Sequence, residues 1–124
     1  MVQFSSYWEA REAVRSGQKF DAALLDMLMP AEAHTLGTDG QTKWLGVEMD
    51  FGTVTAFELA RLGVKLVAVA TDSNHHSHPA SAMVDWFDKE HFWVNQALVI
   101  IMHSPMRDDG TKDWAEVLRI LIVE

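Results

Sequence analysis

Apolar residues occur in three short, nearly continuous runs, and polar residues follow each run. The runs cover residues 22–25, 64–70 and 97–102. An apolar run of this length without alternation is typical of a strand that is covered on both faces, as in a parallel sheet. The pattern therefore predicts three buried strands.

Between these runs, apolar residues recur at helical spacing. Ser6 and Glu9 have the Ser-x-x-Glu spacing of a capping box, and Gly17 is a suitable end for the helix that follows. Further helices are expected at about residues 54–62, 79–87 and 114–121. The polar stretch between residues 30 and 52 has no clean period and is expected to be a long loop.

Helices that alternate with continuously apolar strands predict a single α/β domain over residues 1–124. We expect a mostly parallel sheet of about four to five strands with helices on both faces. In such sheets, ligands bind outside the carboxyl ends of the strands. Asp26, Thr71, Asp72 and His103 follow the predicted strands, so a site is expected at that edge.

Composition narrows the classes of function. The chain has 124 residues, a formal net charge of -8 and no cysteine. The acidic charge disfavours nucleic-acid binding, which depends on Lys and Arg, and the lack of cysteine excludes thiolate chemistry. No apolar run reaches the roughly 18 residues of a membrane-spanning helix, and no secretory leader opens the chain. We therefore expect a cytoplasmic protein without nucleic-acid or membrane partners.

Residues 24–30, Leu-Leu-Asp-Met-Leu-Met-Pro, resemble the strand of response-regulator receiver domains that ends in the phosphoaccepting aspartate. Residues 4–13 resemble the second strand and helix of that family, and Thr71 stands where receivers have a Ser or Thr that contacts the phosphoryl group. The resemblance implies a receiver- or flavodoxin-like three-layer sandwich and a role in two-component signal transduction. It also implies that Asp26 and Thr71 are phosphoacceptor-type catalytic positions.

The sequence departs from the receiver pattern at several points. Ser104-Pro105 stands in place of the usual Lys-Pro, and no acid pair precedes Phe4 to hold magnesium. Phosphoryl transfer to a carboxylate needs a divalent cation and a positive side chain, so Asp26 without the acid pair or the lysine is expected to be a poor phosphoacceptor. We therefore expect a degenerate receiver-like module that acts through protein–protein contact and is not an enzyme. Alternatively, Asp26 only caps the turn that follows it.

A metal site is another hypothesis. Three histidines and an aspartate lie between residues 72 and 78, and carboxylates from other segments could join them. The candidate ligands for Mg²⁺ or Zn²⁺ are Asp26, Glu48, Asp72, His75, His76 and His78. This set favours a small metal-binding protein or metal-dependent enzyme. No known ligand spacing is matched, so a polar turn that caps the next helix remains open. A small-molecule sensor that binds its ligand at the same strand edge is a third hypothesis.

Four aromatic residues surround a charged segment: Trp86, Phe87, Phe92 and Trp93. Such residues are most often packed at the edge of a core. If they are exposed together, they predict a surface for a protein partner, because Trp is enriched at interface hot spots. A homodimer is one form that such a contact would take.

Overall fold

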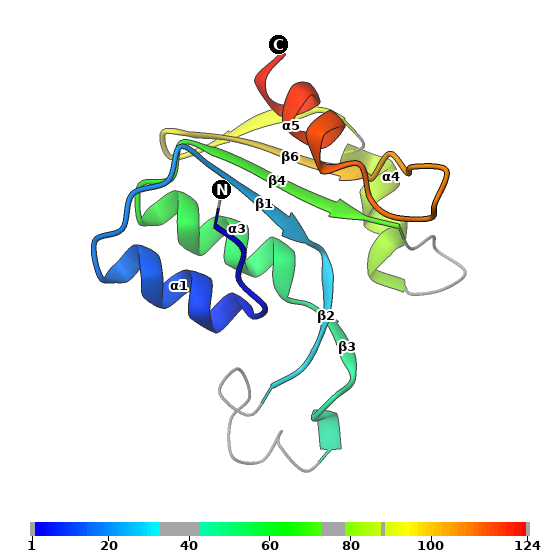
Figure 1. Cartoon of the computed structure of the whole chain (residues 1–124), viewed down its shortest axis with the longest axis horizontal. Coiled ribbons are helices and arrows are strands. Elements are labelled where there is room, and N and C mark those ends of the chain that lie inside the picture. The colour runs from blue at the N-terminus through cyan, green and yellow to red at the C-terminus, as the bar shows by residue number, and fades with distance from the viewer. Residues whose placement is uncertain (1, 33–42, 73–78, 88, 124) are drawn as a thin grey trace.

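The computed structural model describes residues 2–32, 43–72, 79–87 and 89–123 of the chain. Over these residues the protein has a mixed α/β fold with a mostly parallel four-stranded sheet (Figure 1). The strands are β1 (Ala22–Asp26), β2 (Leu28–Pro30), β3 (Glu48–Asp50), β4 (Leu66–Thr71), β5 (His91–Val94) and β6 (Ala97–His103). The helices are α1 (Tyr7–Arg15), α3 (Phe51–Arg61), the 3-10 helix η2 (Pro79–Met83), α4 (Val84–Phe87) and α5 (Trp114–Ile122).

The four strands of the main sheet are ordered β1-β4-β6-β5. Strands β1, β4 and β6 are parallel, and they correspond to the three strands that the apolar runs predicted. Strand β5 was not predicted; it pairs with β6 in an antiparallel hairpin. The register aligns Asp26 with Ala70 and Thr71 with His103, so the carboxyl ends of the three parallel strands lie at one edge.

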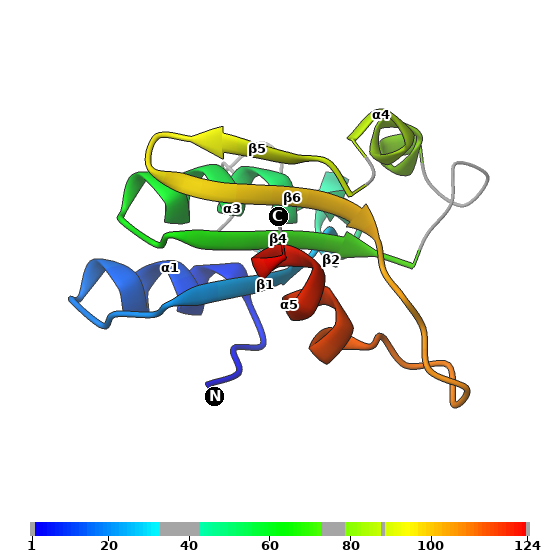
Figure 2. The same ribbon diagram turned by 90° about the horizontal axis from the view of Figure 1, so that it is seen from above.

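Helices lie on both faces of the sheet. Helices α1 and α3 are on one side and α5 is on the other, as Figure 2 shows from above. In β4, Val67 and Val69 belong to the core beside α3, whereas Ala68 and Ala70 belong to the core beside α5. Burial of both strand faces explains why the apolar runs do not alternate with polar residues.

The helix ends follow local chemistry. Ser6 Oγ accepts a hydrogen bond from the Glu9 backbone N–H at 3.2 Å, which is one half of the predicted capping box. Helix α3 begins at Phe51, earlier than predicted, because Asp50 Oδ1 caps it by accepting from the Thr53 N–H at 3.0 Å. The helix expected at 79–87 is divided into η2 and the single-turn α4.

A second, two-stranded sheet forms at the two ends of the long loop that was expected at about residues 30–52. Strands β2 and β3 pair in antiparallel register and extend away from the main sheet (Figure 1). The Ala31 N–H continues this ribbon by donating to the Val47 carbonyl at 2.8 Å. Residues 33–42 lie outside the described residues.

Across the described ranges, no helix is both long enough and apolar enough to cross a membrane.

Candidate functional site at the carboxyl edge of the sheet

The ends of the three parallel strands bring polar residues together at one edge of the sheet. Asp26 ends β1, Thr71 ends β4 and is followed by Asp72, and His103 ends β6. Hydrogen bonds continue between neighbouring strands past these ends: the Met27 N–H donates to the Ala70 carbonyl at 2.9 Å. The backbones of neighbouring strands are therefore hydrogen-bonded up to this edge. The prediction that these polar residues lie at the same edge of the sheet is confirmed.

Lys112 lies between two carboxylates at this edge. Its Nζ is 2.5 Å from Asp26 Oδ1 and 3.8 Å from Asp72 Oδ1. The Lys112 side chain is only 18% exposed, whereas that of Asp26 is 38% exposed and that of Asp72 is 56% exposed. An ammonium group shielded in this way is attracted by both carboxylates with less solvent screening than a pair on an open surface.

The position of Lys112 corrects one expectation from the sequence. No positive side chain was expected beside Asp26, but the Lys112 ammonium group reaches its carboxylate. The interpretation of Asp26 as only a turn cap is also incomplete, because its carboxylate makes this ion pair. Asp26 and Lys112 are far apart in the chain, so no local spacing indicated that they meet.

A tight turn over residues 107–111 reverses the chain after β6 and places Lys112 at the edge of the sheet. Met106 and Lys112 form an isolated antiparallel bridge, and the Arg107 N–H donates to the Thr111 carbonyl at 2.8 Å. Gly110 adopts φ +84°, a left-handed conformation that L-residues rarely take. Asp109 Oδ1 accepts from the Thr111 N–H at 3.0 Å. The dipeptide Asp109-Gly110 is a local signal for a turn, but it does not indicate which residue the returning segment meets.

Tyr7 supports the other side of Asp26. Its hydroxyl donates a hydrogen bond to the Asp26 backbone carbonyl, which links the first turn of α1 to the end of β1. Burial raises the pKa of Tyr7 above its usual value of 10, and the nearby carboxylates of Asp26 and Asp50 raise it further. The hydroxyl therefore stays protonated, and able to donate to this carbonyl, above the pH at which an exposed tyrosine ionises.

Gly52 packs directly against the backbone at Asp26. A Cβ at this position would lie 2.7 Å from Met27 Cα and would also collide with the Asp26 carbonyl. The Gly52 N–H donates to the Met27 carbonyl at 3.0 Å. The first turn of α3 therefore fits against the end of β1 only because residue 52 has no side chain.

The other predicted positions are placed as follows. Thr71 is 3% exposed, and its carbonyl accepts from the Ser104 N–H at 2.9 Å. His103 Nε2 lies 2.8 Å from Asp85 Oδ1 of α4. The His103–Asp85 pair ties α4 to the end of β6.

The described residues contain no group of side chains that would support the metal-site hypothesis. Within residues 2–32, 43–72, 79–87 and 89–123, no three His, Asp or Glu side chains come together as a metal-binding group, so Asp26, Glu48 and Asp72 do not form one. Glu48 begins β3 on the ribbon, where it pairs with Pro30. The predicted ligands His75, His76 and His78 lie outside the described residues.

The four aromatic residues proposed as an interface are not all on the surface. Trp86 is 81% exposed, Trp93 is 65% exposed and Phe87 is 40% exposed. Phe92 instead packs against the core, and its ring centroid lies 5.9 Å from that of Phe87. Phe92 and Trp93 are neighbours in β5 and therefore point to opposite faces of the sheet.

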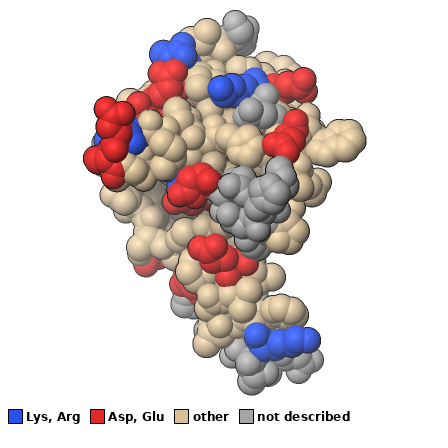
Figure 3. Space-filling model, turned by 90° about the vertical axis from the view of Figure 1, so that its right-hand side faces the viewer, with Lys and Arg blue, Asp and Glu red and all other residues tan. Residues whose placement is uncertain are grey.

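Figure 3 shows the molecule from the side at which the parallel strands end. Acidic side chains are spread over this face, and Lys and Arg side chains do not form one continuous basic surface on it. Comparison with known proteins gave no matching family model, no matching curated protein and no matching solved structure.

Proposed function

We propose that this chain is a receiver-like regulatory module that acts through protein–protein contact, with Asp26 held by Lys112. The observation that carries the proposal is the 2.5 Å ion pair between Lys112 Nζ and Asp26 Oδ1. Strands β1, β4 and β6 lie in consecutive order and present Asp26, Thr71 and the Lys112 segment at one edge. These are the three residue types that receivers use there, which supports a receiver- or flavodoxin-like three-layer arrangement and a cytoplasmic role in signal transduction.

Asp26 is a poor phosphoacceptor in this proposal. Phosphoryl transfer needs a divalent cation beside the accepting carboxylate, in addition to a positive side chain. Lys112 supplies the positive charge, but its ammonium group also stands where the carboxylates of Asp26 and Asp72 approach each other. A magnesium ion would have to displace Lys112 to bind both carboxylates. In this proposal the module therefore regulates a partner protein by binding it, and not by catalysing phosphoryl transfer.

The test is an amide NMR titration with beryllofluoride and Mg²⁺, which mimic an aspartyl phosphate. We expect the amides of Asp26, Asp72 and Ser104 to keep their positions in the wild-type protein. The Asp26→Asn variant is the control for effects of the salts alone. Shifts at these amides that disappear in Asp26→Asn would show an active phosphoacceptor and would refute the proposal.

A metal-binding protein or metal-dependent enzyme is the second candidate, and one observation favours it. Asp26 and Asp72 both approach the same cation, the Lys112 ammonium group. Replacing Lys112 with Met would leave the two carboxylates facing each other without it. A rise in Tm with Mg²⁺, Mn²⁺ or Zn²⁺, larger in Lys112→Met than in wild type, would support this candidate. No rise in either protein would remove it.

A further inference from the structure

A groove of about 500 Å³ lies between α1 and α3, and its lining includes Tyr7, whose hydroxyl donates to the Asp26 carbonyl. Tyr7, Trp8 and Arg11 line it from α1, and Val54, Phe57 and Arg61 are among the residues that line it from α3. Its volume is in the range of protein sites that bind ligands. The lining combines apolar side chains with guanidinium groups, which is the composition of a recognition surface.

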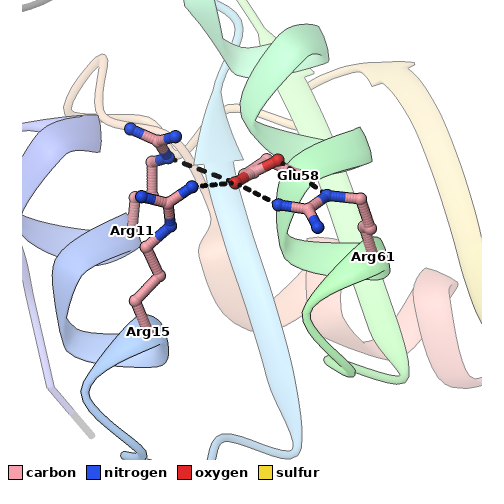
Figure 4. Close-up of polar contacts among 4 residues, drawn as sticks. All are labelled: Arg11, Arg15, Glu58 and Arg61. Carbon is pink, nitrogen blue, oxygen red and sulfur yellow. Dashed lines mark hydrogen bonds and ion pairs between the residues drawn. The ribbon is translucent and has the colours of Figure 1, made fainter.

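Three arginines meet one carboxylate between α1 and α3, as Figure 4 shows, and Arg11, Glu58 and Arg61 also line the groove. Arg11 and Arg15 reach Glu58 Oε1 from α1, at 3.2 Å and 3.4 Å. Arg61 approaches the same oxygen from within α3 at 2.8 Å and donates through Nε to Glu58 Oε2 at 3.1 Å. We call these four residues the arginine cluster.

The arginine cluster has more positive charge than Glu58 can neutralise. Hydrogen bonds from Arg61 and then Arg11 lower the pKa of Glu58 to about 2, so this carboxylate is ionised near neutral pH. Among the described residues, it is the carboxylate within ion-pair distance of all three guanidinium groups. Within the cluster three guanidinium groups face one carboxylate; α1 also carries the exposed Glu9 and Glu12.

The guanidinium groups also have donors to spare within the described part of the chain. Each guanidinium has five N–H donors. The hydrogen bonds to Glu58 use one donor of Arg11, one of Arg15 and two of Arg61. An incoming carboxylate could therefore accept further hydrogen bonds in the paired geometry that arginine favours.

The apolar part of the groove is open to solvent. Val54 is 66% exposed, Phe57 is 49% exposed and Trp8 is 36% exposed. Trp8 lies on α1, and Val54 and Phe57 lie on α3; all three line the groove together with Arg11 and Arg61. A small molecule in so open a groove would leave much of this apolar surface in water, whereas an amphipathic helix would cover it.

We propose that the groove between α1 and α3 binds an acidic amphipathic helix of a partner protein. Apolar side chains of the partner pack on Val54 and Phe57, and its Asp or Glu side chains pair with the arginine cluster. Charge complementarity selects this occupant: three guanidinium groups stand beside Glu58, the one carboxylate of the described residues that lines the groove, while the net charge of -8 opposes a nucleic acid. This inference rests on the proposed function, since it names the partner that a contact module would bind.

The experiment measures fluorescence anisotropy of a labelled synthetic peptide with the full chain. The peptide has about four helical turns, with Leu and Phe on one face and Glu on the other, and a second peptide has Lys in place of Glu. We expect the acidic peptide to bind more tightly than the basic one, and added salt to weaken its binding. Amide shift mapping should place the acidic peptide on α1 and α3.

Matched variants test the assignment. Arg61→Gln removes one charge and is expected to weaken binding of the acidic peptide about tenfold. Arg119→Gln is the control, because Arg119 forms the same type of pair with Glu116 three residues earlier on α5 and is equally exposed, at 58%. It should change binding less than about twofold. Phe57→Ala, at an exposed position, should also weaken binding, because the partner's apolar side chains pack on Phe57; unchanged binding would refute that contact.

Four results would overturn the inference: no binding of the acidic peptide, equal binding of both peptides, equal losses in Arg61→Gln and Arg119→Gln, or shifts confined to other elements. Sedimentation with vesicles that contain an anionic lipid tests the other source of negative charge. Binding to vesicles in place of the peptide would assign the groove to a membrane surface and would equally refute the inference.

The failures of the two proposals are distinguishable. If the peptide does not bind while the Asp26 amide stays unmoved by beryllofluoride, only the groove assignment is wrong. If beryllofluoride moves the Asp26 amide, the proposed function is wrong, and the peptide titration still decides the groove independently.

Discussion

Lys112 forms an ion pair with Asp26 across the carboxyl edge of the sheet, and the pair joins the segment after β6 to the end of β1. Strand β4 lies between β1 and β6, so this contact passes over the end of the central strand. The residues that follow β6 are therefore part of the candidate site, and the edge is built from segments distant in the sequence.

The energy of this pair can be measured by a double-mutant cycle with Asp26→Asn and Lys112→Met. We expect a coupling free energy of about 1 kcal/mol at neutral pH and low salt, because the ammonium is shielded while Asp26 is partly exposed. Urea unfolding of the four proteins gives the value. Lys65→Met is the control, since Lys65 donates to Gln96 at 2.8 Å on the exposed opposite edge. A coupling near zero would mean that the pair does not stabilise the fold.

Tyr7 provides a direct optical probe of the site, because it is the only tyrosine in the chain. Its pKa is raised above 10 by burial and by Asp26 and Asp50, so tyrosinate absorbance should appear only above the usual pH range. The folded protein binds this proton more tightly than the unfolded chain. The resulting stability is fully present below pH 10 and is lost as the pH rises further.

In the Asp26→Asn variant, the pKa of Tyr7 should fall but remain above its usual value, because burial is the largest cause of the shift. Ultraviolet absorbance titration followed together with circular dichroism separates ionisation from unfolding. Ionisation of Tyr7 near pH 10 in the folded wild-type protein would contradict the arrangement of Tyr7 against Asp26.

Glu58 makes stability depend on acid pH. Its pKa falls from 4.5 to about 2 in the folded protein because Arg61 and Arg11 donate to it. A lowered pKa contributes stability that is present above pH 4.5 and is lost as the pH falls toward 2. In Glu58→Gln, the free energy of unfolding should therefore change less over this pH range than in wild type. Urea unfolding at a series of pH values measures it, and identical slopes for the two proteins would be inconsistent with the arginine cluster.

Gly52 should resist substitution even by alanine. Helix propensity alone favours Ala over Gly by up to about 1 kcal/mol. The Cβ would lie 2.7 Å from Met27 Cα, however, so we expect Gly52→Ala to lower the free energy of unfolding by about 1–3 kcal/mol. Gly17→Ala is the comparison, because a Cβ there meets nothing within 4 Å and its cost comes only from φ +102°. A stabilising Gly52→Ala substitution would show that β1 and α3 are not packed so closely.

The elements of this protein were predictable where the signal was local. The runs at 22–25, 64–70 and 97–102 became β1, β4 and β6 because strands buried on both faces need apolar side chains at every position. Strand β5 was missed because its alternation of Phe92 and Val94 toward the core is only four residues long. The ribbon of β2 and β3 was missed because three-residue strands carry no measurable period.

The candidate site was predictable only in part. Asp26, Thr71 and Asp72 were expected at the strand ends, since the carboxyl ends of parallel strands meet at one edge. Lys112 was not expected, because its approach depends on the turn around Gly110 and on the order of the strands. The arginine cluster was not expected either, because it requires α1 and α3 to lie side by side on the same face of the sheet.

By itself, the sequence determined the α/β class, the three parallel strands and the polar residues that follow them. It did so because burial and capping act between residues that are close in the chain. The tertiary structure alone decided that Lys112 lies beside Asp26, that Gly52 packs on the end of β1, and that three arginines share Glu58. These contacts join distant segments, and their formation depends on strand order and helix placement, which no local spacing encodes.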